Sequence, residues 1–260
     1  HNGTIVHVSQ GATLSSAAAY AAAHGLALED LAEYFISPGL IDAHVHISAV
    51  GGRGWEGYAT ATRAAAAGGV TSILGMPLNS LPPTVSVEAL EMEASQMEME
   101  GIHVDVGLWG GVVPSSLTGG QLEKLLADGR VLGVKAFLSP LPPAAGYEAV
   151  SPEELHAVGR AAAKASLPLL VHCELMSTDE MATLNVDGLR AHVVHLSDAG
   201  SISLILKAKA QFAEEIPDGE TRLKLLGLER KLGGCPRSSL LFGGRSALLS
   251  SQGCIIAKAA

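Results

Sequence analysis

Cysteines, aromatic residues and long apolar runs are all scarce in this sequence of 260 residues, which has 3 cysteines and 4% aromatic residues. Three scattered cysteines, Cys173, Cys235 and Cys254, are too few for a disulfide framework, so we expect a reducing compartment and a cytoplasmic location. No uninterrupted apolar run reaches the about 18 residues of a membrane span, which argues against a transmembrane protein. A formal net charge of −9 without a basic cluster makes nucleic acid and anionic membranes poor partners.

What the sequence does contain is a regular alternation of apolar and amphipathic segments. Apolar residues make up 48% of the chain, which is enough for a substantial core. We predict strands over 35–47, 70–76, 102–111, 131–138, 168–174 and 189–196, and helices over 56–68, 87–100, 119–128, 151–166 and 199–211. This α/β alternation favours a parallel sheet with helical crossovers, either an open doubly wound sheet or a (β/α)8 barrel.

Side chains that commonly bind metals occur at or near the carboxyl ends of these strands. They are His44, His46, Lys135, His172 and His195. In a barrel the strand ends converge on one site, whereas an open sheet spreads them along a crevice, so we favour the barrel. Only six strand runs are visible, and residues 175–188 barely leave room for a crossover helix. The sequence therefore predicts an incomplete TIM-type (β/α)8 barrel.

The same five residues define a candidate metal site. His44 and His46 lie on one side of a strand because side chains alternate, and two neighbouring imidazoles can bind a transition metal, typically zinc. Taken alone, such a pair occurs by chance more often than as ligands. Asp42, two positions before His44, faces the same side, so we expect it to orient an imidazole. Lys135 lies in an apolar strand, so either its stem extends to solvent or its amine is neutralised or modified. Single strand-end histidines such as His172 and His195 are commonly core or capping residues, but the five together favour a metal site.

Several longer motifs resemble the cyclic amidohydrolases and, within them, the allantoinases. The motifs are Ile36-Ser37-Pro38-Gly39-Leu40-Ile41-Asp42-Ala43-His44-Val45-His46, Trp55-Glu56-Gly57-Tyr58, Met76-Pro77-Leu78-Asn79-Ser80 and Gly133-Val134-Lys135-Ala136-Phe137. The likeness extends from about Asp30 to Lys224 and is densest over 36–175. It implies a metal-dependent hydrolase barrel over 35–211, with residues 1–34 as the remnant of a small β-subdomain. We expect a divergent, poorly structured tail over 212–260.

The resemblance also implies how the candidate ligands divide. His44 and His46 would hold one divalent metal ion, and His172 and His195 would hold a second. Lys135, carboxylated to a carbamate, would bridge the two ions, which we expect to be zinc. Two such ions make hydroxide available at neutral pH for attack on a ring amide.

A substrate follows from the same resemblance. Ser48 stands where dihydroorotases keep an arginine, which favours allantoin over dihydroorotate, and Asn79 lies in a loop that can face the substrate. The expected reaction opens the hydantoin ring of allantoin to allantoate in purine catabolism, with a small-molecule substrate and a homo-oligomer as an open possibility. A dihydropyrimidinase or hydantoinase of the same architecture and a non-catalytic relative are the alternatives.

The sequence departs from the family pattern in its later part. The helix between the strands of His172 and His195 is short, and a strand expected before Phe212 is absent. No Asp-His-Ser-Pro motif occurs, although in the family its aspartate is the last metal ligand and the proton shuttle. No catalytic acid–base residue is therefore identified. We interpret the chain as a truncated or mis-spliced family member, which weighs against activity of this chain by itself.

Overall fold

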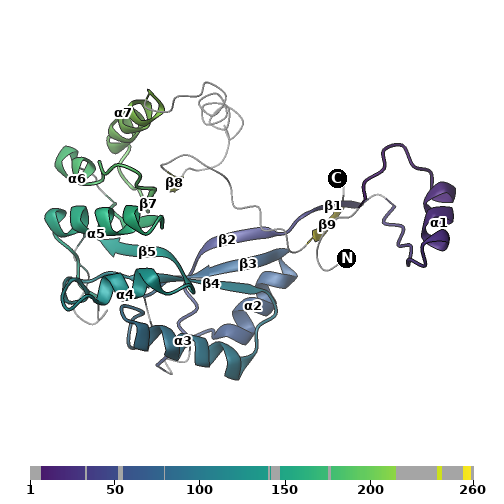
Figure 1. Cartoon of the computed structure of the whole chain (residues 1–260), viewed down its shortest axis with the longest axis horizontal. Helices are drawn as coiled ribbons and strands as arrows, with labels where there is room; N and C mark the ends of the chain where they lie inside the picture. The colour runs from purple at the N-terminus through teal and green to yellow at the C-terminus, as the bar shows by residue number, and fades with distance from the viewer. Residues whose placement is uncertain are drawn as a thin grey trace.

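The computed structural model describes residues 7–32, 34–51, 55–78, 80–139, 141, 147–174, 177–214, 239–241 and 254–258 (Figure 1). The strands are β1 (Tyr34–Pro38), β2 (Leu40–Val45), β3 (Val70–Gly75), β4 (Asp105–Gly111), β5 (Val131–Phe137), β6 (Leu169–His172), β7 (Ala191–Val194), β8 (Ser239–Leu241) and β9 (Cys254–Lys258). The helices are α1 (Leu14–Ala23), α2 (Tyr58–Ala67), α3 (Val87–Glu100), the 3-10 helix η1 (Pro114–Leu117), α4 (Gln121–Ala127), α5 (Pro152–Lys164), α6 (Thr178–Thr183) and α7 (Ser201–Glu214).

The larger of two sheets has the strand order β2-β3-β4-β5-β6-β7-β8. Among the described residues its first six strands are parallel, and β8 pairs antiparallel with β7. Figure 1 shows this sheet curving, with helices α2 to α5 outside the curve. Parallel strands with helical crossovers on the outside are the construction of a TIM barrel, here with six of the eight strands. The predicted incomplete barrel is confirmed.

The strand predicted over 35–47 is in fact two strands in different sheets. Strand β1 pairs antiparallel with β9, whereas β2 pairs with β3 at the edge of the large sheet. The break falls at Gly39, where an added Cβ would lie 1.9 Å from Thr71 Oγ1. Only glycine allows the backbone to pass this close to a neighbouring side chain, so the chain changes sheets here.

The main core lies between the outer face of the sheet and the helices that cover it. Val134, Val171 and Val193 pack there with Leu155 and Val158 of α5, and all five side chains are at most 1% exposed. Helix α5 begins as predicted, since Ser151 and Glu154 form a reciprocal capping box. The strands at this side of the sheet are consequently covered on their outer face.

The connection between β6 and β7 is as short as the sequence indicates. Its helix α6 covers only Thr178–Thr183, although a crossover helix is usually longer. The N-terminal region contains helix α1, and residues 1–6 of the predicted β-subdomain remnant lie outside the described residues. Strands β8 and β9 come from the predicted tail, and the boundaries of both end regions stay predictions. Within the described residues, no helix has the length and hydropathy to cross a membrane.

Candidate metal centre

The inner face of the curved sheet carries the candidate ligands. Lys135, Leu170 and His192 are in register on β5, β6 and β7. Leu170 packs on Met76 and Trp109 in a buried cluster distinct from the one beneath α5. Residues in register on adjacent parallel strands point to the same face, so Lys135 and His192 point into the curve with Leu170.

One layer further toward the strand ends, Phe137 and His172 are in register on β5 and β6. Their rings stack with centroids 4.5 Å apart. His195 follows directly after β7 and has a φ of 57°, a backbone conformation that is uncommon for residues other than glycine. Such strained residues concentrate at functional sites, which makes the turn after β7 a functional candidate.

The four predicted histidine ligands come together from three strands. The ring centroids of His44 and His46 are 5.3 Å apart, and those of His44 and His195 are 4.6 Å apart. The rings of His195 and His172 are 4.8 Å apart. These imidazoles therefore form a continuous chain of contacts across the carboxyl ends of β2, β6 and β7, which lie far apart in the sequence.

Lys135 lies beneath this chain of rings and is 1% exposed. Its Nζ has no hydrogen-bond partner and stands 5.0 Å from the centroid of the Phe137 ring. Its backbone is fixed, because the Tyr147 hydroxyl donates to the Lys135 carbonyl at 2.6 Å while Val112 N donates to that hydroxyl at 2.8 Å. Burial lowers the pKa of Lys135 to about 7, so near neutral pH a large share of this amine is uncharged.

The histidines are likewise uncharged near neutral pH. Burial, reinforced by the Lys135 ammonium, lowers the pKa of His44 to about 3 and the pKa of His195 to about 4. The same two causes lower the pKa of His46 and of His172. A neutral imidazole is the form that binds a metal ion, so the electrostatics of the site keep its ligands available.

His192 belongs to this site, although the sequence interpretation assigned it no role. It points into the curve beside Lys135, and its Nε2 is buried without a hydrogen-bond partner. Burial, then Lys135 and His195, lowers the pKa of His192 to about 4. Strict alternation would put His192, three positions before His195, on the opposite face, but His195 lies beyond the strand with a φ of 57°, so the sequence alone did not indicate this orientation.

Two hydrogen bonds hold the backbone of strand β2 in place. Trp109 Nε1 donates to the Ala43 carbonyl at 2.9 Å from the inside of the sheet. The Asp42 carboxylate accepts from the backbone N–H of His44 at 3.0 Å. The sequence suggested that Asp42 orients an imidazole, but its contact is with the backbone of the ligand instead.

A buried carboxylate joins the loops that follow β2 and β3. Glu93 is 4% exposed and accepts hydrogen bonds from the Tyr58 hydroxyl and, at 2.5 Å, from Ser80 Oγ. Leu81 N also donates to the Val50 carbonyl at 3.2 Å, which connects the same two loops through the backbone. These contacts fix the loops in which the two predicted substrate-binding residues occur.

Of those two residues, Ser48 lies two positions after His46 in the chain, and Asn79 lies outside the described residues. Ser48 is 5% exposed and has a φ of 54°. Its hydroxyl is buried without a hydrogen-bond partner. A polar group left unsatisfied in a strained conformation is costly unless a ligand completes it, which fits a substrate contact.

The side chains fit a binuclear metal site in kind, although they do not form a closed cage. In the described ranges, no three His, Cys, Asp or Glu side chains are arranged to hold a metal ion directly. One imidazole nitrogen, His172 Nε2, lies 3.3 Å from Glu174 Oε1 and would have to exchange this contact for a metal. Neutral imidazoles next to a buried, unpartnered lysine are nevertheless the donor set that two such ions require.

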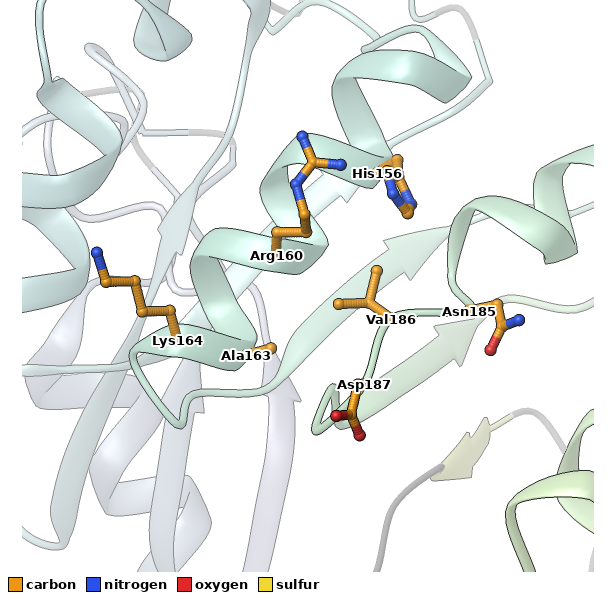
Figure 2. Close-up of a pocket in the computed structure, with 7 residues that line it drawn as sticks. All are labelled: His156, Arg160, Ala163, Lys164, Asn185, Val186 and Asp187. Atoms are coloured by element: carbon orange, nitrogen blue, oxygen red, sulfur yellow. The ribbon is translucent and has the colours of Figure 1, made fainter. Parts of the chain in front are cut away.

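A groove elsewhere in the molecule has no connection to this site. It has a volume of about 500 Å³ and lies between α5 and the segment that follows α6 (Figure 2). Its lining residues are His156, Arg160, Ala163, Lys164, Asn185, Val186 and Asp187. Because none of them belongs to the inner face of the sheet, the groove is no part of the candidate metal centre.

Comparison with known proteins agrees with this architecture. Residues 35–248 match the Amidohydrolase family. The chain belongs to the amidohydrolase family. Amidohydrolases of this superfamily depend on metal ions, in accord with the histidine-rich strand ends.

Two amidohydrolase relatives from eukaryotes share much of this sequence. The chain is 36% identical over 253 residues to an allantoinase of Arabidopsis thaliana, a match that covers 75% of this chain and 49% of that protein. It is 31% identical over 277 residues to an allantoinase of Saccharomyces cerevisiae, covering 86% of this chain and 58% of the yeast protein. The chain thus spans about half the length of the curated relatives it matches.

The solved structures that resemble this chain are likewise covered over about half of their length. An L-hydantoinase (dihydropyrimidinase) from Arthrobacter aurescens is 25% identical with a TM-score of 0.55, covering 68% of this chain and 46% of the other. A D-hydantoinase structure has a TM-score of 0.62 at 17% identity, covering 81% of this chain and 50% of the other. The second likeness establishes the fold alone.

Proposed function

We propose that this chain forms the metal-binding half of a hydrolase that opens the hydantoin ring of allantoin to allantoate. The observation that carries the proposal is the convergence of His44, His46, His172 and His195 above the buried, unpartnered Lys135. The names of the relatives, allantoinases from plant and yeast, supply the substrate. A homo-oligomer with a small-molecule substrate is part of the proposal.

In this proposal His44 and His46 would hold one divalent ion, expected to be zinc, and His172 and His195 would hold a second. Lys135, as a carbamate, would be the shared ligand. When bound, the ions supply Lewis acidity and activate water at neutral pH. Trp109 and Tyr147 hold the backbones of the ligand strands β2 and β5 in place, so only side chains have to adjust when the ions bind.

The chain's own residues also prepare the substrate side. Ser48 presents an unsatisfied hydroxyl, and its chain neighbours Ile47 and Ala49 pack in one apolar cluster with Tyr58. Asn79 contributes an amide from the loop after β3. The residue that moves the proton is unassigned, because the Asp-His-Ser-Pro motif is absent from the sequence.

The decisive experiment measures bound zinc and ring opening on the full chain. After dialysis against zinc chloride, we expect about two zinc ions per chain by elemental analysis. Turnover is then compared among allantoin, hydantoin and dihydrouracil, with Lys135→Ala as the inactive control. Absence of bound zinc, or equal zinc in His44→Asn/His172→Asn and the parent chain, would contradict the proposal.

The second candidate function is a hydantoinase, which the 25% identical L-hydantoinase structure favours. Its substrates lack the ureido arm of allantoin. Preferential opening of hydantoin or dihydrouracil in the same panel would establish this alternative. Zinc binding without turnover of any ring would instead identify a non-catalytic relative that retains the metal centre.

A further inference from the structure

Two buried nitrogen atoms without partners face the same interior layer of the sheet. They are Lys135 Nζ and His192 Nε2. Their residues are both in register with Leu170 on the strand between them. An unsatisfied buried polar atom is costly, and a pair of them in one layer indicates a group that completes both.

The distance between the two strands suits such a bridging group. Strands two apart in a sheet are separated by about 10 Å, which the two long side chains cover only in part. Leu170, between them, offers no polar atom, and the ring of Phe137 is the contact recorded for Lys135 Nζ. The Lys135 ammonium also acts on the strand-end imidazoles above it, and the His192 ring is the polar group in register with it on β7.

His192 makes none of the ring contacts described among the four strand-end histidines, although its charge acts on His44 and the charge of His195 acts on it. Those contacts connect His46, His44, His195 and His172, and none described includes His192. Its position in register with Lys135 associates it with the lysine, one layer below the strand ends. A second metal-ligand role therefore has less support than a role toward Lys135.

We propose that His192 is a positioning residue that donates a hydrogen bond from Nε2 to a carbamate on Lys135, an inference that rests on the proposed function. The carbamate forms when the lone pair of the neutral amine makes an N–C bond to carbon dioxide. One C–O π bond becomes an oxygen anion, and the displaced N–H proton passes to water. The carbamate extends the lysine toward β7 and adds two acceptor oxygens, which the imidazole N–H can meet.

The test follows the carbamate by 13C NMR. Each full-length variant is equilibrated with 13C-labelled bicarbonate at the same concentration of zinc chloride. The signal is assigned by its loss in Lys135→Ala. We expect His192→Met to need about tenfold more bicarbonate for half-maximal signal, because a charge-assisted hydrogen bond is lost. His192→Gln, which retains an N–H donor, should recover most of this loss. If the methionine variant does not fold, His192→Phe takes its place.

A matched control is His156→Met on the outer side of α5, where Nδ1 contacts the Thr183 carbonyl. It should leave the bicarbonate titration unchanged. Equal titrations for the parent chain and His192→Met would overturn the role of His192 and leave the proposed function intact. Absence of a Lys135-dependent signal in the parent chain would overturn both this inference and the bridging carbamate.

Discussion

Strand β2 and strands β5 to β7 supply ligands to the same centre from contrasting surroundings. The first residue of β6, Leu169, is 0% exposed, whereas Leu40, the first residue of β2, is 60% exposed. Strand β2 stands at the edge of the large sheet and β6 within it. Parallel strands are normally covered on both faces, so the edge strand is the less stabilised of the two. The comparison teaches that three of the five proposed ligands come from strands within the packed sheet, whereas His44 and His46 come from its less covered edge strand.

The largest expected effect is the difference in stability cost between truncating Leu169 in β6 and truncating Leu40 in β2. Leu169→Ala should lower the free energy of unfolding by about 2–5 kcal/mol, because it removes a fully buried side chain and leaves a cavity. Leu40→Ala should cost less than about 1 kcal/mol, because most of its surface already contacts water. Urea unfolding followed by circular dichroism measures both. Equal costs would show that the two regions are packed alike.

Zinc should bind to ligands from both β2 and the group of strands β5 to β7, and should therefore stabilise the fold. If it binds across them, zinc at 100 times its dissociation constant should raise the free energy of unfolding by about 2.7 kcal/mol. His44→Asn in the open strand and His172→Asn in the covered half should each reduce this increase. His156→Asn, away from the centre, is the control and should retain it. If zinc still raised the free energy of unfolding fully in His44→Asn, the metal would be bound by residues of β5 to β7 alone.

The stability of edge strand β2 and of the loop after it should depend on the buried Glu93 carboxylate. Tyr58→Phe removes one of the two donors to Glu93, and we expect a loss of about 1–3 kcal/mol of stability. Hydrogen exchange should accelerate in the loop after β2 while the amides of β6 keep their protection. Tyr20→Phe, whose side chain is 43% exposed, is the matched control. Uniform acceleration in both regions would mean that Glu93 supports the whole fold instead.

The smallest expected effect concerns a surface cluster of three charged residues, Arg130, Asp128 and Glu91. Arg130 bonds Asp128 at 2.7 Å and Glu91 at 2.9 Å, and hydrogen bonds from Arg130 lower the pKa of Asp128 to about 2. A depressed carboxyl pKa stabilises the fold above about pH 4 and ceases to do so as pH falls through about 2. Arg130→Gln should therefore cost less than about 1 kcal/mol at pH 7, and this cost should shrink as the pH falls through about 2. A cost of the same size at pH 7 and well below pH 2 would show that the arginine acts through packing.

Sequence periodicity predicted most of the fold because the barrel repeats one local pattern. Helices α2 to α5 and strands β3 to β7 begin and end close to the predicted positions, since apolar strand segments alternate with helical segments that have recognisable ends. The division of the first strand at Gly39 was missed. It depends on the close approach of Thr71 from a distant segment, which no local pattern contains.

The site was predictable to the extent that strand ends mark it. The positions of His44, His172 and His195 at the ends of apolar runs indicated their convergence, and the sheet brings them together. The inward orientation of His192 follows from strand register, which a single sequence does not determine. Asp42 was assigned to an imidazole because period-two reasoning considers side chains and leaves out the backbone N–H it actually meets.

The indole of Trp109 gives this molecule a built-in optical probe. The two tryptophans differ sharply, since Trp55 is 57% exposed and Trp109 is 6% exposed. A collisional quencher such as iodide or acrylamide will therefore act first on Trp55 and leave the emission of Trp109. Because the Trp109 indole donates to the Ala43 carbonyl, its residual emission reports on the strand that carries the histidine pair. Substituting Trp55→Phe turns the chain into a single-fluorophore sensor whose spectrum follows the seating of that strand.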